Sequence, residues 1–124
     1  MECACIEACE GDFATVLNDK KVVARTLHKC CECGRIIKRG ETYRTESALY
    51  EGSVTTYKTC CDCNSIRDAF VCSWNWGEVL EAVRNSIFDN LCDISESGIA
   101  DLTCAARERV CEWIEECWEW HEED

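Results

Sequence analysis

Cysteines are the residues of this chain whose type and spacing could do chemistry. Two similar clusters, CCEC and CCDC, each contain one Cys-x-x-Cys turn, Cys30 with Cys33 and Cys60 with Cys63. Such a turn can aim two sulfurs at one ion, and Zn²⁺ prefers four soft or borderline ligands arranged as a tetrahedron. The sequence therefore predicts at least one zinc ion, held by these four cysteines.

The compartment decides between metal sites and a disulfide framework as the explanation for 14 cysteines in 124 residues. The N-terminus lacks the pattern of a signal peptide, and no apolar stretch is long enough to cross a membrane. We therefore expect a cytoplasmic protein without a membrane partner, whose thiols stay reduced or bind metal. Buried thiols without a metal are one alternative. A redox pair is another, disfavoured because no βαβ pattern surrounds the two turns.

The cysteines nearest the N-terminus are candidates for a second metal site. Cys3, Cys5 and Cys9 crowd the first ten residues, and Cys72 or His28 could supply a fourth ligand. The alternative is a frayed terminus with free thiols. This second site stays open from sequence alone.

The other cysteines have simpler interpretations. Cys31 and Cys61 occupy the same inner position of the two clusters, and we interpret them as spectators, with alternative ligands as the competing hypothesis. Cys104, Cys111 and Cys117 fall on or near the buried side of a predicted helix, where cysteine packs as a small hydrophobe.

The segment between the two clusters predicts a short strand, a turn and a β-hairpin. Ile36 and Ile37 follow the first cluster, and residues 42 to 59 are rich in Thr, Tyr and Val with one break, at Glu51-Gly52. A two-residue turn there would place Leu49 opposite Val54 and Ser47 opposite Thr56. The Cys60 cluster should then open a helix, because Ile66, Ala69 and Phe70 have helical spacing.

Two further helices are predicted after this unit. Asn75 and Glu78 resemble a capping box for the first of them. Its apolar face is predicted to comprise Val79, Leu80, Val83, Ile87 and Leu91. Residues 93 to 98 are predicted to form a loop, and a last helix should run from about Asp101 to Trp120. Its buried stripe is predicted to comprise Leu102, Ala106, Val110, Trp113, Cys117 and Trp120.

The predicted fold is therefore α+β, a single domain over residues 1–124. It comprises a zinc-binding hairpin unit (20–72) and an acidic helical part (73–124). A β-hairpin between two Cys-x-x-Cys turns, the second of which begins a helix, resembles a treble-clef zinc finger. A zinc ribbon is the alternative.

The segment HKCCECGRIIKRGETYRTESALYEGSVTTYKTCCDC also resembles the central part of small, poorly characterised bacteriophage and prophage proteins. The resemblance covers roughly residues 1 to 80. Cys3 and Cys5 match the Cys-x-Cys with which those proteins commonly begin, and VCSWNW loosely matches their Cys-rich Trp segment. Here that segment holds only Cys72, and the acidic C-terminal helix lies outside the resemblance. The resemblance implies that the protein is located in the cytoplasm of a bacterial host.

Charge is divided unevenly along the chain, whose net charge is -12. Residues 20 to 69 carry ten bases and six acids, whereas residues 70 to 124 carry three bases and fourteen acids. The basic segment 20–44, with Tyr43, Tyr50 and Tyr57 available for stacking, supports an alternative function as a nucleic-acid-binding or transcription accessory factor. The net negative charge of the whole chain opposes that alternative, because it repels the phosphates of nucleic acid.

Catalysis is not expected. Some treble-clef proteins are nucleases that need a histidine base on the hairpin, but the histidines here, His28 and His121, lie outside it. A site with four cysteine ligands also leaves no open coordination position for a substrate.

The acidic last helix predicts a protein-binding surface. Carboxylates near a helix C-terminus oppose the helix dipole, so stability alone does not explain them. The candidate partner-binding residues are Glu112, Glu115, Glu116, Trp118 and Glu119. A solubilising tail is the alternative. With the phage resemblance, the predicted role is to bind a basic nucleic-acid-binding host protein such as a defence enzyme, with inhibition of that protein as the expected result.

Overall fold

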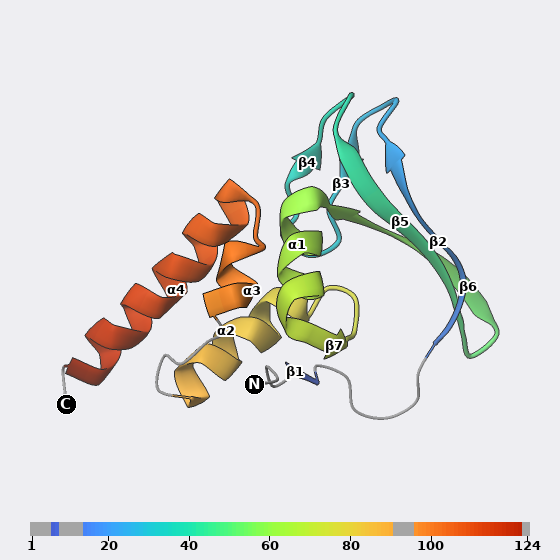
Figure 1. Ribbon diagram of the computed structural model, residues 1–124. Coiled ribbons are helices and arrows are strands. Elements are labelled where there is room, and N and C mark those ends of the chain that lie inside the picture. Colours follow the sequence, from blue (N-terminus) through green and yellow to red (C-terminus); the bar gives the residue numbers. More distant parts are fainter. Residues whose placement is uncertain (1–5, 8–13, 91–95, 123–124) are drawn as a thin grey trace.

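The computed structural model describes residues 6–7, 14–90 and 96–122 and has an α+β fold. In Figure 1 helix α1 stands between a β-sheet and the other helices. The strands are β1 (Ile6–Glu7), β2 (Thr15–Val23), β3 (His28–Lys29), β4 (Ile36–Ile37), β5 (Thr42–Tyr50), β6 (Ser53–Cys60) and β7 (Val71–Ser73). The helices are α1 (Cys61–Phe70), α2 (Val79–Asp89), α3 (Glu96–Ala100) and α4 (Cys104–Glu122).

The largest sheet is antiparallel, with strand order β2-β5-β6. The predicted hairpin is confirmed, because Leu49 pairs with Val54 and Ser47 with Thr56. Gly52 and Glu51 both have positive φ, as a two-residue primed turn requires. Strand β2 was not predicted, because its sequence, TVLNDKKVV, has three consecutive charged residues and no clear alternation.

Two small strand pairs complete the connections. Strand β4 is the predicted short strand after the first cluster, and it pairs antiparallel with β3. Strand β7 follows α1 directly and pairs in parallel with β1. These pairs hold the chain segments that enter and leave the cysteine-rich unit.

The helices share one apolar core. Helix α1 contributes Ile66 and Phe70, as predicted, and α2 contributes Val79, Val83 and Ile87. Helix α4 covers them with Ala106, Val110, Ile114 and Cys117, and Leu102 precedes it. A second, smaller core surrounds the cysteine clusters, and half-buried Leu80 packs against both cores.

Three predictions about the C-terminal half were wrong, and one lies outside the described residues. Trp120 is 55% exposed instead of buried, because Ile114 completes the buried stripe of α4. Residues 96–100, predicted partly as loop, form the short helix α3. The capping box fails because Glu78 makes no side-chain cap hydrogen bond. Leu91 lies outside the described residues.

A buried ion pair joins the sheet to α1. Arg67 Nη1 lies 2.8 Å from Glu46 Oε1, and both side chains are 1% exposed. Trp74 lies under the guanidinium, with 4.2 Å between Arg67 Cζ and the ring centroid. Trp76 donates its indole N–H to Glu46 and stacks on Tyr57. Trp74 and Trp76, which follow β7, therefore pack around the ion pair between the sheet and α1.

Among the described residues, no helix is long and apolar enough to span a membrane.

Candidate metal centre

The four predicted ligands come together at the junction of the sheet and α1. Cys30 follows β3, Cys33 lies in the next turn, Cys60 ends β6, and Cys63 is in the first turn of α1. Their sulfurs all lie within 4.8 Å of one another, and Cys33 Sγ is 3.9 Å from Cys60 Sγ. A tetrahedral ion with metal–sulfur bonds of about 2.3 Å needs sulfurs about 3.8 Å apart. The cluster therefore has the spacing that a single metal ion requires.

The first Cys-x-x-Cys turn is shaped by the residue that follows it. Gly34 has φ of +78°, and its N–H donates to the carbonyl of Cys30 at 3.0 Å. The N–H of Cys30 donates to the carbonyl of Arg35, closing the loop, and the N–H of Glu32 lies 3.4 Å from Cys30 Sγ. A left-handed residue is required after the turn, and glycine adopts that conformation without steric cost.

The second turn is also the start of a helix. Cys60 is the N-cap of α1, and its sulfur accepts from the N–H of Cys63 at 3.5 Å. The N–H of Cys60 in turn donates to Cys30 Sγ at 3.4 Å. Backbone amides and the positive end of the helix dipole favour thiolates at these positions.

The thiols perturb one another strongly. Hydrogen bonds from the Cys60 and Cys63 thiols lower the pKa of Cys30, and the bond to Cys30 raises the pKa of Cys60 to about 12. The pKa of Cys63 is also raised, mainly by its hydrogen bonds with Cys30 and Cys60. Four thiolates at this spacing need a positive ion to offset their repulsion, and a metal would supply that charge.

The two spectator cysteines point elsewhere. Cys31 Sγ contacts Thr59 Oγ1 at 3.5 Å, and burial raises the pKa of this thiol to about 11. Cys61 is exposed, and its sulfur lies 3.8 Å from Asp62 Oδ1. Neither belongs to the group of sulfurs close enough to share an ion.

The acidic residue inside each turn also bonds to the start of a helix, a role that was not expected from the sequence. Glu32 of the first turn accepts hydrogen bonds from the N–H groups of Gly77, at 2.8 Å, and Val79, at 3.1 Å. These amides lie at the start of α2, so Glu32 caps a helix 45 residues away in sequence. Burial raises the pKa of this carboxyl group, despite the two hydrogen bonds.

Asp62 of the second turn plays the corresponding role for α4. Thr103 donates its hydroxyl to Asp62 Oδ1 at 2.6 Å and accepts from the N–H of Ala106 at 3.2 Å. The N–H of Thr103 also lies 3.4 Å from Ser65 Oγ. Each Cys-x-x-Cys turn is thus hydrogen-bonded to the start of one C-terminal helix. The sequence feature that could have indicated these contacts is the acidic residue that CCEC and CCDC share at the same position, Glu32 and Asp62.

The proposed second metal site is not assembled among the described residues. Cys3, Cys5 and Cys9 lie outside them, and Cys72 is an exposed residue of β7. His28 Nε2 lies 3.5 Å from the Tyr43 hydroxyl, and His28 Nδ1 lies 3.2 Å from Lys58 Nζ.

Two of the three C-terminal cysteines do not pack as predicted. Cys104 is exposed at the start of α4, and Cys111 is partly exposed. Cys117 is fully buried in the helical core, as predicted, and also takes part in a disulfide bond. The packing interpretation is therefore wrong for Cys104 and only partly right for Cys111. It is incomplete for Cys117, whose disulfide bond also departs from the expectation that the thiols stay reduced or bind metal.

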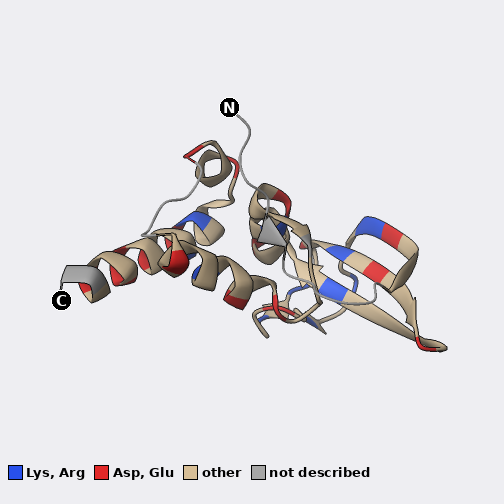
Figure 2. Ribbon diagram, turned by 90° about the horizontal axis from the view of Figure 1, so that it is seen from below, with Lys and Arg blue, Asp and Glu red and all other residues tan. Residues whose placement is uncertain are grey.

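The candidate partner-binding residues all lie on the exposed side of α4. Figure 2 shows acidic residues recurring along this helix. The acidic stripe comprises Glu112, Glu115, Glu116 and Glu119, at the spacing of one helix face. Trp118 is 55% exposed beside it. Glu116 forms an ion pair with Arg84 at 3.3 Å, so it is partly engaged within the molecule.

The predicted stacking surface for nucleic acid is largely absent. Tyr43 is buried and packs on His28, with ring centroids 5.1 Å apart. Tyr57 is stacked on Trp76 at 4.4 Å, which leaves exposed Tyr50 as the available ring of the three. This result weakens the nucleic-acid alternative.

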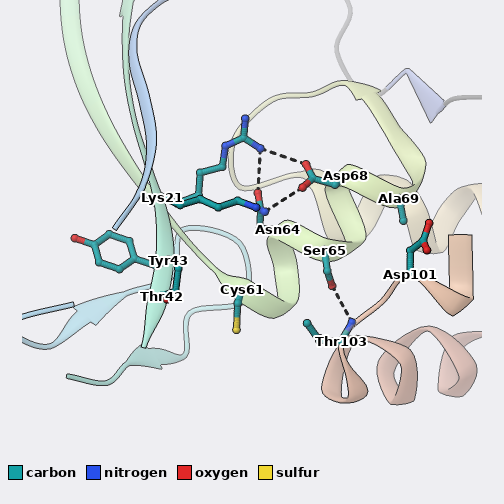
Figure 3. A pocket seen from close by; sticks show the side chains of 11 residues that line it. Lys21, Thr42, Tyr43, Cys61, Asn64, Ser65, Asp68, Ala69, Asp101 and Thr103 are labelled. Atoms are coloured by element: carbon teal, nitrogen blue, oxygen red, sulfur yellow. Dashed lines mark hydrogen bonds and ion pairs between the residues drawn. The ribbon is translucent and has the colours of Figure 1, made fainter. Parts of the chain in front are cut away.

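A hollow of about 380 Å³ lies between the sheet and α1, close to Cys61 (Figure 3). Arg44, Asn64 and Asp68 of its lining already bond to one another. Arg44 donates to Asp19, Asn64 and Asp68, and Asn64 donates to Asp68. The Tyr43 ring points away from α1. The Arg44 and Asn64 donors of this hollow are therefore engaged within the molecule.

Comparisons with protein families, with curated proteins and with solved structures find no match to this chain.

Proposed function

We propose that this chain is a non-enzymatic zinc-binding module of treble-clef-like architecture that presents an acidic helix to a protein partner. The observation that carries the proposal is the four-sulfur cluster, whose members lie within 4.8 Å of one another. Four thiolates are the donor set of structural zinc sites and leave a tetrahedral ion no open position for catalysis.

The acidic stripe supports the choice of partner. Its carboxylates lie on the face of α4 opposite the buried stripe, and Trp118 is exposed beside them. Aromatic side chains within a charged surface are typical anchors of protein interfaces. We infer a partner with a basic surface, such as a nucleic-acid-binding enzyme. With the phage resemblance, the partner would be a host defence protein in the bacterial cytoplasm, and binding would inhibit it.

Metal analysis of purified, reduced protein tests the first half of this proposal. Cys33→Ser should lose both the metal and the fold, because structural zinc contributes roughly 10 to 16 kcal/mol in small zinc domains. Cys31→Ser and Cys61→Ser are matched controls from the same clusters and should keep the metal. A folded, reduced wild-type protein without metal would contradict the proposal.

The second half is tested by partner binding. Replacing the four glutamates of the acidic stripe by glutamine should leave metal content unchanged and slow association with a partner recovered from host lysate. Trp118→Ala should speed dissociation instead. Glu81→Gln with Asp89→Asn, which neutralises exposed acids on α2, is the control. If binding by the stripe and Trp118 variants is normal, α4 is a solubilising helix.

A further inference from the structure

The strand pair β3–β4 has one buried face and one exposed face. His28 pairs with Ile37 and Lys29 pairs with Ile36, and directly opposite residues of an antiparallel pair share a face. Ile37 is fully buried in the core around the cysteine clusters, so its face is the inward one. Lys29 and Ile36 therefore lie on the outward face, and both are exposed. A lysine and a large aliphatic side chain thus lie side by side on this surface.

The two loops next to this strand pair carry more side chains of the same kinds. Loop 24–27 joins β2 to β3, loop 38–41 joins β4 to β5, and both form the end of the molecule above β3 and β4 in Figure 1. The N–H of Ala24 donates to the carbonyl of Glu41 at 2.8 Å, and the N–H of Gly40 donates to the carbonyl of Ala24 at 2.9 Å. These bonds hold the loops together. The exposed basic and aliphatic residues of the loops are Arg25, Leu27, Lys38 and Arg39.

The basic end comprises these two loops, the outward face of β3–β4 and Val23, and its bases have no carboxylate partner. Arg35, Arg44 and Arg67 each form an ion pair with an acid. Within the part of the chain that the structure describes, no ion pair involves the bases of the basic end, Arg25, Lys29, Lys38 and Arg39. The carboxylate of loop 38–41, Glu41, is engaged by Arg35 at 3.0 Å. The basic end is thus a positive surface on a chain whose net charge is -12.

Large aliphatic side chains accompany these bases. Leu27 is 66% exposed, Ile36 is 49% exposed, and Val23, directly before loop 24–27, is 61% exposed. Residues 23–41 contain no Phe, Trp or Tyr, so this segment has no such ring to stack on the bases of nucleic acid. The phosphates of nucleic acid would leave the aliphatic side chains in water, whereas the boundary between the headgroups and acyl chains of a bilayer buries them. The combination of bases and aliphatic side chains therefore favours a lipid surface over a nucleic acid.

We propose that the basic end binds the surface of a membrane that contains anionic lipid. Its four bases face the headgroup phosphates, while Val23, Leu27 and Ile36 enter the boundary between headgroups and acyl chains. Contact of this kind needs no membrane-spanning helix, so it differs from the sequence-based expectation of a protein without a membrane partner. The site uses no residue of the acidic stripe. Helix α4 lies on the other side of α1 from the sheet (Figure 1), and screening over about 8 to 10 Å weakens the repulsion between its acids and the lipid.

Flotation of the metal-loaded full chain with lipid vesicles tests this proposal. At low ionic strength the chain should bind vesicles of phosphatidylglycerol mixed with phosphatidylcholine and should not bind phosphatidylcholine alone. Each neutralised base should weaken binding about fivefold, so Arg25→Gln with Arg39→Gln should weaken it about 25-fold. Arg109→Gln, which neutralises an exposed base on α4, should bind like the wild type.

A second pair of variants tests the aliphatic contact. Leu27→Ser with Ile36→Ser should weaken binding to the mixed vesicles roughly tenfold, because less apolar surface is buried in the bilayer. Val54→Ser is the matched control, since Val54 is 60% exposed but lies next to the β5–β6 turn, outside the basic end. Metal content and circular dichroism of every variant show whether the fold is kept.

A folded, metal-loaded wild type that does not bind the mixed vesicles would overturn the proposal. Binding that the double arginine variant leaves unchanged would overturn it as well. Single-stranded and duplex oligonucleotides, measured by fluorescence anisotropy in the same buffer, should not bind. Oligonucleotide binding that the arginine variant abolishes and the serine variant leaves intact would assign the basic end to nucleic acid instead.

Discussion

Replacing Glu32 by alanine should destabilise the start of α2 without removing the metal. Glu32 is not one of the four candidate ligands, and its carboxylate accepts hydrogen bonds from the N–H groups of Gly77 and Val79. Gly77 is exposed, so water can replace its lost bond, at a cost of about 0.5 to 1.5 kcal/mol. Val79 is buried, and an unsatisfied buried N–H costs about 1 to 3 kcal/mol. The free energy of unfolding should therefore fall by about 1.5 to 4.5 kcal/mol.

Glu32→Gln is the matched variant. Its amide oxygen can still accept one of the two hydrogen bonds, and a neutral group avoids the burial cost that raises the pKa of Glu32. We expect this variant to lose only about 1 kcal/mol. The order of stability should be wild type, glutamine, alanine.

Urea unfolding of the metal-loaded proteins measures both losses, with metal content determined for each sample. Amide hydrogen exchange should place the change in the first turn of α2, around Val79 and Leu80. An alanine variant that keeps its metal and loses less than about 0.5 kcal/mol would refute the reasoning, because neither lost hydrogen bond would then have measurable weight.

Three further predictions follow from described contacts. Thr103→Val should cost about 2 kcal/mol in urea unfolding, because it removes both the N-cap of α4 and the bond to the second metal turn. Glu46→Gln should cost about 3 to 5 kcal/mol by leaving Arg67 buried and unpaired, and Arg67→Met added to it should recover part of that loss in a double-mutant cycle. Gly98→Ala should lower the thermal midpoint, at a cost of about 1 to 3 kcal/mol, because a Cβ there would lie 2.4 Å from Phe70 Cε1.

The local features of the fold were predictable from sequence. The candidate ligand set follows from the spacing of two Cys-x-x-Cys turns, and the hairpin register follows from a two-residue turn flanked by alternating residues. The helix after Cys60 was predictable because its apolar residues recur at three-and-four spacing. Each of these signals lies within a short segment of the chain.

The contacts between distant segments were not predictable in the same way. Glu32 caps α2 in place of Glu78, and no local pattern distinguishes such a long-range cap from a capping box. Strand β2 forms because it pairs with β5 along its whole length. This pairing outweighs the weak strand pattern of its own sequence. Trp120 is left exposed, with its ring centroid 6.0 Å from that of Phe88, because Ile114 packs in the helical core instead.

The position of the β5–β6 hairpin between the two Cys-x-x-Cys turns has a consequence for the order of folding. Twenty-six residues separate Cys33 from Cys60, and closing so long a flexible loop costs about 3 kcal/mol of chain entropy. A hairpin with its own turn forms within microseconds and brings the ends of that segment together before any ion binds. The rate of metal capture should therefore depend on Gly52, far from every ligand. Strand β2, which must return to β5 from outside this loop, is expected to join afterwards.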